Sequence, residues 1–294
     1  MERVYGQRPN EKGWYWRHNG NPLGRHIHWV AQDGDKIVSQ ASLGLVSMTV
    51  NGEQMLAGQA ETFVTDAEYR RQGLCSQLVK NAHAEGISRG MALMYAYPNA
   101  QSYPLFKKLG YFDVPLNFMV APLLPLMPWS WKTSAQSESG NPFTADVNIG
   151  EGSIEVLKHK DYLRWKYVDN PVAQYATFKE NGKGYVVGRM KQVHGIKVGC
   201  IFEIDLPCKN DWRSMLQAFV LVMRMKDYFR RNGAKFAFYN MVGGAEWYRL
   251  LRVCGFHSLG LLTARRDRFV ACAGAVLVKP SDKWFMQLGD SEDL

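Results

Sequence analysis

The chain has 294 residues, 46% hydrophobic and 21% charged, which fits one large or two ordinary folded domains and excludes a disordered protein. Its net charge of +9 favours an anionic ligand or an acidic partner, but the scattered basic residues lack the long runs of a dedicated nucleic-acid binder. The five cysteines show neither zinc-site spacing nor a dense disulfide pattern, as is typical of a reducing cytosol.

Two segments bear on membrane targeting. Residues 1–14 lack the apolar core of a secretory signal. The most apolar stretch, residues 118–131, is short and contains three prolines, so it does not predict a membrane span. We therefore expect a cytoplasmic protein that makes no membrane contact.

The first half predicts an antiparallel meander followed by alternating helices and strands. The expected strands are 28–31, 36–50 and 54–65, with hairpin turns at Asp33-Gly34 and Asn51-Gly52. A helix from Gly73 to about Ser88, a strand at 92–97, a short helix at 103–109 and a closing strand at 112–122 follow. This order predicts an α/β fold with a mixed sheet flanked by helices.

Four features of the first half recur in the same order in the second. Residues 16–22 and 165–171 both read Trp, a base, an aromatic ring, two residues and Asn-Pro, at an offset of 149. The other echoes pair residues 33–38 with 181–187, 95–99 with 236–240, and 105–111 with 250–256. We predict a tandem duplication with one domain over 1–131, a polar linker over 132–148 and a second domain over 149–294.

The loop between the strand ending at Thr65 and the helix starting at Gly73 has the chemistry of an anion site. Free N–H groups and the helix dipole attract negative charge at a helix start. Gly73 allows a ligand to approach the backbone closely, and Arg70 and Arg71 add positive charge beside it. The loop therefore predicts a binding site for a pyrophosphate.

Arg70-x-x-Gly73-x-Cys75 resembles the acyl-CoA loop of the GNAT superfamily of N-acyltransferases, Gln/Arg-x-x-Gly-x-Gly/Ala. Asn99, Leu105-Phe106 and Gly110-Tyr111 resemble the second stretch of that family that contacts CoA. The resemblance covers most of residues 28–122 and implies tandem GNAT-like domains with acetyl-CoA as co-substrate. The residues that it places against acyl-CoA are Phe63, Val64, Thr65, Arg70, Arg71, Gln72, Gly73, Leu74, Cys75, Ser76, Asn99 and Phe106.

The sequence departs from the family pattern at two positions. Cys75 replaces the last small residue of the loop, where it is either a reactive thiol or a small packing residue. Phe106 stands where many members have the tyrosine thought to protonate the leaving thiolate. Tyr103, on the same helical face, and Tyr97, at the end of the preceding strand, are the candidate replacements, and ordinary packing is the alternative for each.

Acyl transfer to an amine requires a base, because a free amine is protonated at neutral pH. The resemblance implies that the backbone of residues 63–65 pairs with the pantetheine and polarises the carbonyl of the thioester. Glu61 is the candidate base, acting directly or through water. The alternative is a carboxylate in an edge salt bridge or in solvent, since the parity of the strand is not fixed by the sequence.

Metal chemistry is not expected, because His26, His28 and His83 have none of the spacings of known metal motifs. At the equivalent of the CoA loop, residues 205–212 lack Arg-x-x-Gly, and Pro207 removes a donor N–H. We therefore expect that the second copy does not bind CoA and instead walls the acceptor cleft.

The leading hypothesis is an N-acetyltransferase acting on a primary amine of a small molecule, an amino sugar or a protein. One alternative is transfer of an aminoacyl group from tRNA, which the basic charge permits but an intact CoA loop disfavours. The other is a CoA- or partner-binding module without turnover, motivated by Phe106 and the degenerate second half.

Overall fold

The computed structural model describes residues 10–123, 141–143, 154–179, 184–205, 212–243, 245–259 and 268–291. The chain divides into two compact units, and each takes segments from both halves of the sequence. Unit 1 comprises Met1–Pro115, Asn148–Val172 and Arg265–Trp284, and unit 2 the remainder. Of the expected linker 132–148, only residues 141–143 lie within the described part, so the domain boundary placed there stays a prediction.

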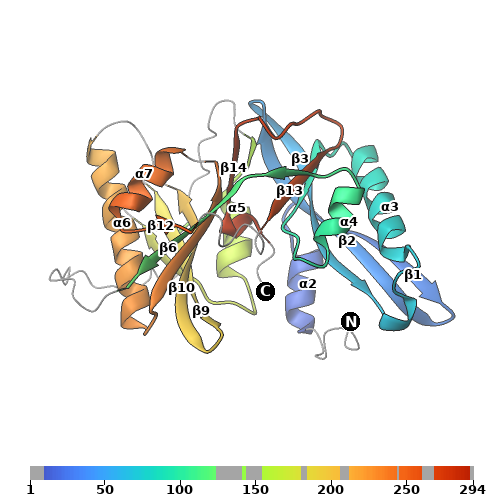
Figure 1. Ribbon diagram of the computed structural model, residues 1–294, viewed down its shortest axis with the longest axis horizontal. Helices are drawn as coiled ribbons and strands as arrows, with labels where there is room; N and C mark the ends of the chain where they lie inside the picture. Colours follow the sequence, from blue (N-terminus) through green and yellow to red (C-terminus); the bar gives the residue numbers. More distant parts are fainter. Residues whose placement is uncertain are drawn as a thin grey trace. The chain divides into compact units, whose positions relative to one another are not determined.

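Unit 1 is a mixed sheet flanked by helices, which confirms the α/β prediction (Figure 1). The strand order is β5-β13-β4-β3-β2, and both β1 and β7 also pair with β2. Its elements are α2 (Glu11–Asn19), β1 (Ile27–Asp33), β2 (Lys36–Val50), β3 (Glu53–Thr65), η1 (Ala67–Tyr69), α3 (Leu74–Ser88), β4 (Leu93–Ala96), α4 (Tyr103–Lys108), β5 (Phe112–Val114), β7 (Ile154–Val156), α5 (Lys160–Leu163), the π-helical turn η2 (Arg164–Val168) and β13 (Phe269–Ala273).

The hairpin of β2 and β3 forms the centre of unit 1. Asn51 and Gly52 both have positive φ, 55° and 86°, which is the backbone of the tight turn that Asn-Gly predicts. Leu43 and Met48 of β2 are fully buried, and α3 packs against β1, β2 and β3 through a face that includes Leu78. The hairpin and α3 thus supply the apolar core beneath the predicted anion loop.

β3 and β4 are parallel neighbours over only two residue pairs, Gly58↔Met94 and Gln59↔Tyr95. Just beyond these pairs, β3 carries two residues, Thr62 and Phe63, opposite a single residue of β2. Thr62 has a φ of 45°, and such a bulge bends a strand and re-aims its groups. Among the described residues, no strand pairs with β3 beyond Gln59 on the side of β4, and we call this side of the strand its open edge.

The strand expected at 112–122 is two strands, β5 in unit 1 and β6 (Leu116–Pro122) in unit 2. Pro115 separates them because a proline has no N–H to donate to a sheet. β5 pairs with β13, whereas β6 pairs with β11. The single closing strand of the sequence prediction was therefore wrong at this residue.

Unit 2 repeats the order of two antiparallel strands, helix, parallel strand and helix. Its parallel pair runs from Val198↔Phe236 to Ile201↔Tyr239, and its core packs against α6 through residues such as Phe229. Its elements are β6, β8 (Ala176–Lys179), β9 (Tyr185–Val193), β10 (Ile196–Asp205), α6 (Trp212–Arg231), β11 (Phe236–Val242), α7 (Ala245–Val253), β12 (His257–Ser258) and η4 (Leu288–Asp290). Strand β14 (Trp284–Gln287) also belongs to unit 2, except for its first residue, Trp284. Residues 206–211, where the degenerate loop was predicted, lie outside the described part of the chain.

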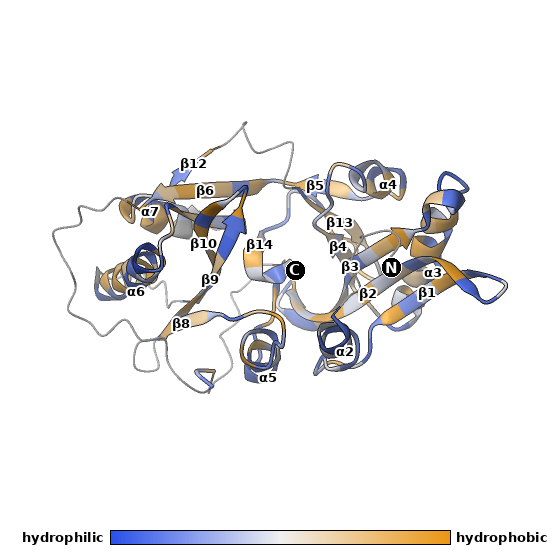
Figure 2. Ribbon diagram, turned by 90° about the horizontal axis from the view of Figure 1, so that it is seen from below, coloured by the Kyte–Doolittle hydropathy of each residue, from blue (hydrophilic) through white to orange (hydrophobic). Residues whose placement is uncertain are grey.

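The first sequence echo forms matching local structure inside unit 1. Helix α2 spans residues 11–19, and α5 with η2 spans residues 160–168, so both ends keep the offset of 149. The indole nitrogens of Trp16 and Trp165 each donate to the backbone carbonyl of the other residue, at 2.9 and 3.1 Å, and the rings stack with centroids 4.9 Å apart. Figure 2 shows α2 and α5 as two hydrophilic helices beside each other.

The Asn-Pro sequence after each helix also has the same geometry. Asn21 accepts a hydrogen bond from the backbone N–H of Leu23 at 2.9 Å, and Asn170 accepts one from Val172 at 3.0 Å. Each is an Asx-turn, in which the side chain stands in for a backbone acceptor. Residues 11–23 and 160–172 are therefore structural equivalents as well as sequence echoes.

Candidate functional site

The predicted anion loop connects β3 to α3 through the short helix η1. Asp66 caps η1 by accepting from the backbone N–H of Glu68 at 3.3 Å, and Arg70 donates from Nε to the carbonyl of Thr65 at 3.2 Å. Arg71 and Gly73 both have positive φ, 63° and 82°. These interactions bring the chain sharply from the end of β3 to the start of α3.

Helix α3 begins with an open N-terminus. Gly73 is its N-cap, and no side chain among the described residues caps this end. A Cβ built on Gly73 meets nothing within 4 Å, so the space in front of the helix is free. The N–H groups of Leu74, Cys75 and Ser76 belong to the first turn, whose donors have no partner within a helix. A helix start with these properties suits an anion.

Burial decides between the two interpretations of Cys75. The thiol is partly buried and packs against a small core cluster that includes Leu78 and Val79. This burial raises the pKa of the Cys75 thiol, which opposes the reactivity that a helix N-terminus could have given it. The structure therefore favours a packing role for Cys75.

The residues predicted to contact acyl-CoA fall into two groups. Phe63, Val64 and Thr65 are the last residues of β3, and Asp66 with η1 joins them to Arg70–Ser76, so this group lies on one short stretch of chain. Asn99 instead organises the turn before α4, accepting from the backbone N–H groups of Gln101 and Ser102. Phe106 is 1% exposed and lies in the core, with its ring against that of Phe63. A direct contact of Asn99 or Phe106 with acyl-CoA stays a prediction.

The two tyrosines considered as proton donors have different surroundings. The Tyr103 hydroxyl donates to both carboxylate oxygens of Asp113, at 3.0 and 3.1 Å, and the guanidinium of Arg268 lies 3.6 Å from the centre of its ring. Tyr97 is half-buried, with its ring packed against Phe269 at a centroid distance of 5.1 Å. Tyr103 would have to exchange Asp113 for the substrate in order to act as an acid.

Glu61 lies in the interior of unit 1 and is 7% exposed. Burial raises the pKa of its carboxyl group, while the positive charges of Arg17 and Lys166 act in the opposite direction. Its Oε2 atom lies 3.7 Å from Nδ1 of His26 and has no hydrogen-bond partner among the described residues. A buried carboxyl group with a raised pKa is a candidate acid–base group.

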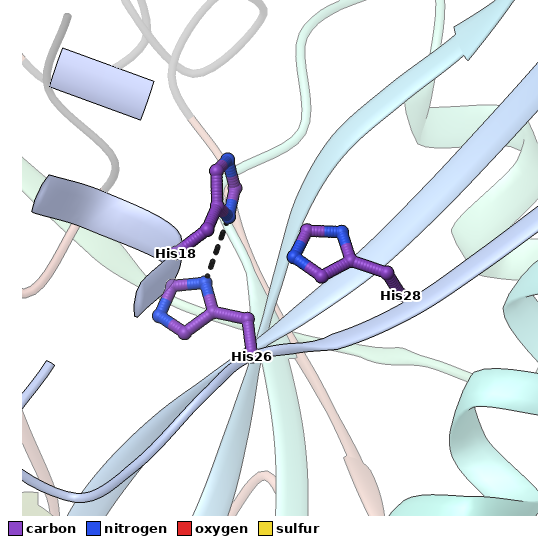
Figure 3. A group of neighbouring side chains, drawn as sticks. All are labelled: His18, His26 and His28. Carbon is purple, nitrogen blue, oxygen red and sulfur yellow. Dashed lines mark hydrogen bonds between the residues drawn. The ribbon is translucent and has the colours of Figure 1, made fainter. Parts of the chain in front are cut away.

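Two features of this environment were missed by the sequence reasoning. Arg17 and Lys166 occupy equivalent positions of the first echo, so the second half of the chain contributes a charge beside Glu61. His18 of α2 donates or accepts a hydrogen bond with His26 through their Nδ1 atoms, 3.1 Å apart, and His28 lies beside them (Figure 3). His26-x-His28 was the available signal: His26 lies just before β1 and His28 is its second residue, and residues two apart in an extended chain share a face.

His83 provides a prediction about stability. Its Nε2 atom lies 2.6 Å from the hydroxyl of Tyr111, and burial lowers the pKa of His83 from 6.5 to about 4. The unfolded chain therefore takes up this proton before the folded protein does, so stability falls as the pH drops from 6.5 towards 4. Between pH 7 and pH 5, we expect His83 to remove about 2 kcal/mol from the free energy of unfolding.

Urea unfolding of the wild type and of His83→Gln at both pH values measures this contribution. Glutamine keeps an acceptor for Tyr111 but does not titrate, so the variant should lose less stability on acidification. An identical pH dependence in the two proteins would contradict the assignment.

No helix within the described residues is long and apolar enough to cross a membrane.

Comparison with known protein families gives a match to the first part of the chain. Residues 1–112 match the family described as acetyltransferase (GNAT) domain, which confirms the resemblance seen in the sequence. No curated protein sequence matches the chain. The match includes the open edge of β3, the loop and α3, and it stops at the start of β5.

Solved structures extend the similarity to both halves of the chain. A protein of Enterococcus faecalis V583 described as a "Probable N-Acyltransferase" has a TM-score of 0.60 at 14% identity, covering 94% of this chain and 68% of that chain. A GCN5-related N-acetyltransferase from Anabaena variabilis ATCC 29413 has a TM-score of 0.58 at 13% identity, covering 92% and 67%. Eis1 from Mycobacterium abscessus has a TM-score of 0.57 at 14% identity, covering 93% and 69%. These likenesses show the fold.

Proposed function

We propose, from the premise that residues 1–112 are a GNAT acetyltransferase domain, that this protein transfers the acetyl group of acetyl-CoA to a primary amine. The observation that carries the proposal is that an unpaired strand edge, a basic loop and an uncapped helix start follow one another along the chain. The open backbone edge of β3 leads into a loop that ends at the uncapped, glycine-started helix α3. A strand edge with no neighbouring strand among the described residues would pair with the pantetheine of acetyl-CoA, and the anion site after it would hold the pyrophosphate.

The loop supplies the groups that would hold the pyrophosphate. The first-turn N–H groups of α3 have no partner within the helix, Gly73 borders open space, and Arg70 and Arg71 are exposed next to them. Phe63, Val64 and Thr65 would pair with the pantetheine through their backbone, as an added strand pairs with a sheet edge. When bound, acetyl-CoA supplies the acyl group as a thioester, and a β3 N–H near the bulge would polarise its carbonyl.

Glu61 is proposed as the base that removes a proton from the ammonium form of the acceptor. Its burial raises the pKa of the carboxyl group towards neutrality, which makes the carboxylate a stronger base. Since the side chain is 7% exposed, the proton passes either directly within the closed site or through a water. Arg17 and Lys166 keep the carboxylate form accessible, because their positive charges oppose the effect of burial.

A non-catalytic acyl-CoA-binding module is the second candidate function. Phe106 cannot donate a proton, and the hydroxyl of Tyr103 is already bonded to Asp113. If the protein is catalytic, Tyr103 is proposed to protonate the leaving thiolate after its hydroxyl releases Asp113.

Transfer from an aminoacyl-tRNA is disfavoured, because the loop chemistry fits a pyrophosphate. The free cysteines agree with a cytoplasmic location, which we also propose.

Turnover is measured as release of the free thiol of CoA, detected with a thiol reagent, after acetyl-CoA is mixed with a panel of amines. The panel contains amino sugars, diamines and lysine peptides, each beside its N-acetylated form as the control. We expect thiol release that depends on a free primary amine. Binding of acetyl-CoA without release on any amine would favour the non-catalytic module, and absence of binding would contradict both.

A further inference from the structure

Three histidines of unit 1 converge next to Glu61. The Nδ1 atoms of His18 and His26 are 3.1 Å apart, and one ring nitrogen from each of the three histidines lies within 4.8 Å of the others. In Figure 3, the outer nitrogen of His28 points towards the His18–His26 pair. We propose that His18, His26 and His28 form a binding site for a divalent transition-metal ion of the zinc type.

The spacing of the nitrogens suits such an ion. Zinc binds imidazole nitrogens at about 2.0–2.1 Å in tetrahedral geometry, which places two ligand atoms about 3.3 Å apart. The His18–His26 distance of 3.1 Å is already close to this value. The third ring has to approach by a small side-chain movement, which is open to His28 because it is only partly buried. Three histidines leave one tetrahedral position for a water or a substrate atom.

The histidines are held in the form that binds metals. A metal requires a neutral imidazole, because a protonated ring has no free lone pair on either nitrogen. The Nδ1 atoms of His18 and His26 share one hydrogen bond, so one of these two nitrogens carries a free lone pair.

Two buried polar atoms at this place lack a hydrogen-bond partner among the described residues. They are Nε2 of His28 and Oε2 of Glu61. Buried polar groups are nearly always paired, so each of them calls for an explanation. A cation between the rings would use the His28 nitrogen directly. Glu61, 3.7 Å from His26, would offset the repulsion between the cation and Arg17.

Metal binding redistributes one proton within the site. The other nitrogen of His26, Nε2, lies 3.3 Å from the amide nitrogen of Asn21, which assigns the ring proton to Nδ1 in the metal-free protein. When Nδ1 binds the metal, the ring keeps a single proton, which moves to Nε2. The Asn21 Nδ2 atom then loses Nε2 as an acceptor but keeps its hydrogen bond to the carbonyl of Leu45 at 2.8 Å. Asn21 Oδ1 stays bonded to the backbone N–H of Leu23.

Titration of the full chain with zinc chloride, after removal of metals by a chelator, tests the site by calorimetry. The wild type is compared with His28→Ala and with His257→Ala, a matched control at an exposed histidine of unit 2. We expect one strong zinc site in the wild type and in the control, and at least about 100-fold weaker binding in His28→Ala. Absence of a strong site, or equal zinc affinity in His28→Ala, would overturn the proposal.

Two further readouts distinguish a metal site from a structural histidine cluster. Cobalt, used in place of zinc, should give the intense visible absorption of tetrahedral coordination in the wild type but not in His28→Ala. His28→Ala loses ring contacts with Trp14 and His18, so the comparison is made within each protein: zinc should raise the melting temperature of the wild type but not that of His28→Ala. Cobalt absorption that is equal in both proteins contradicts the site. The proposal does not depend on acyl transfer, and acetyl-CoA binding measured on the same samples keeps the two tests separate.

Discussion

Gly73→Asp is expected to weaken the binding of acetyl-CoA by about 100-fold or more. The substitution places a side chain and a negative charge in the free space before the first turn of α3. That space is where the phosphates would meet the helix N–H groups, so the change adds both a steric and an electrostatic penalty. Isothermal titration of acetyl-CoA into the wild type and the variant measures the effect.

Gly90→Asp is the matched control for this experiment. Gly90 lies just after the other end of α3, its φ of 80° nearly equals the 82° of Gly73, and a Cβ there also meets nothing within 4 Å. The two variants therefore carry the same backbone strain, and only one of them occupies the proposed phosphate site. Acetyl-CoA binding should be unchanged in Gly90→Asp. Equal binding in the two variants would show that the loop is only a helix start.

Glu61→Gln is expected to lower kcat by about 100- to 1,000-fold while the affinity for acetyl-CoA stays within a factor of three. Glutamine has nearly the same shape but cannot accept the proton of the acceptor ammonium. Because burial raises the pKa of Glu61, the rate of the wild type should fall on acidification at a pH above the ordinary glutamate value of 4.5. The pH profile of kcat, from the thiol-release assay with a responsive amine, measures both effects.

Glu53→Gln is the control, because Glu53 lies on the same strand but is exposed. It should leave both kcat and the acid limb of the profile unchanged. In Glu61→Gln, the acid limb assigned to Glu61 should disappear together with the activity. A variant with reduced kcat and the same acid limb would assign the titration to another group and remove Glu61 as the base.

Local patterns predicted the elements of the first half well. The Asn-Gly turn requires positive φ at two residues, so it fixed the hairpin of β2 and β3, and the apolar period fixed α3 over Leu74–Ser88. The loop between β3 and α3 was also located, because a glycine before a helix and two arginines form a contiguous signal, and its role as an anion site stays a prediction. Elements whose signal lies within a short stretch of sequence could thus be predicted.

The features that required distant parts of the chain were not predicted. β13 comes from residues 269–273 and lies between β4 and β5, and no local pattern marks that pairing. The bulge at Thr62 depends on the register against β2, and it was missed for the same reason. The surroundings of Glu61 come from α2, from β1 and from η2, so only the folded chain brings Arg17 and Lys166 to the same carboxyl group.

The contact between Trp16 and Trp165 joins a residue to its own counterpart, and each side donates the same bond to the other. Such reciprocity is what a two-fold axis produces between the subunits of a homodimer. The two echoed helical segments are therefore related locally as two such subunits would be. The adjacent residues, Arg17 and Lys166, both act on one carboxyl group, that of Glu61. A chain that ended before residue 160 would lose one of these two charges, so the surroundings of Glu61 are complete only with the segment from the second half.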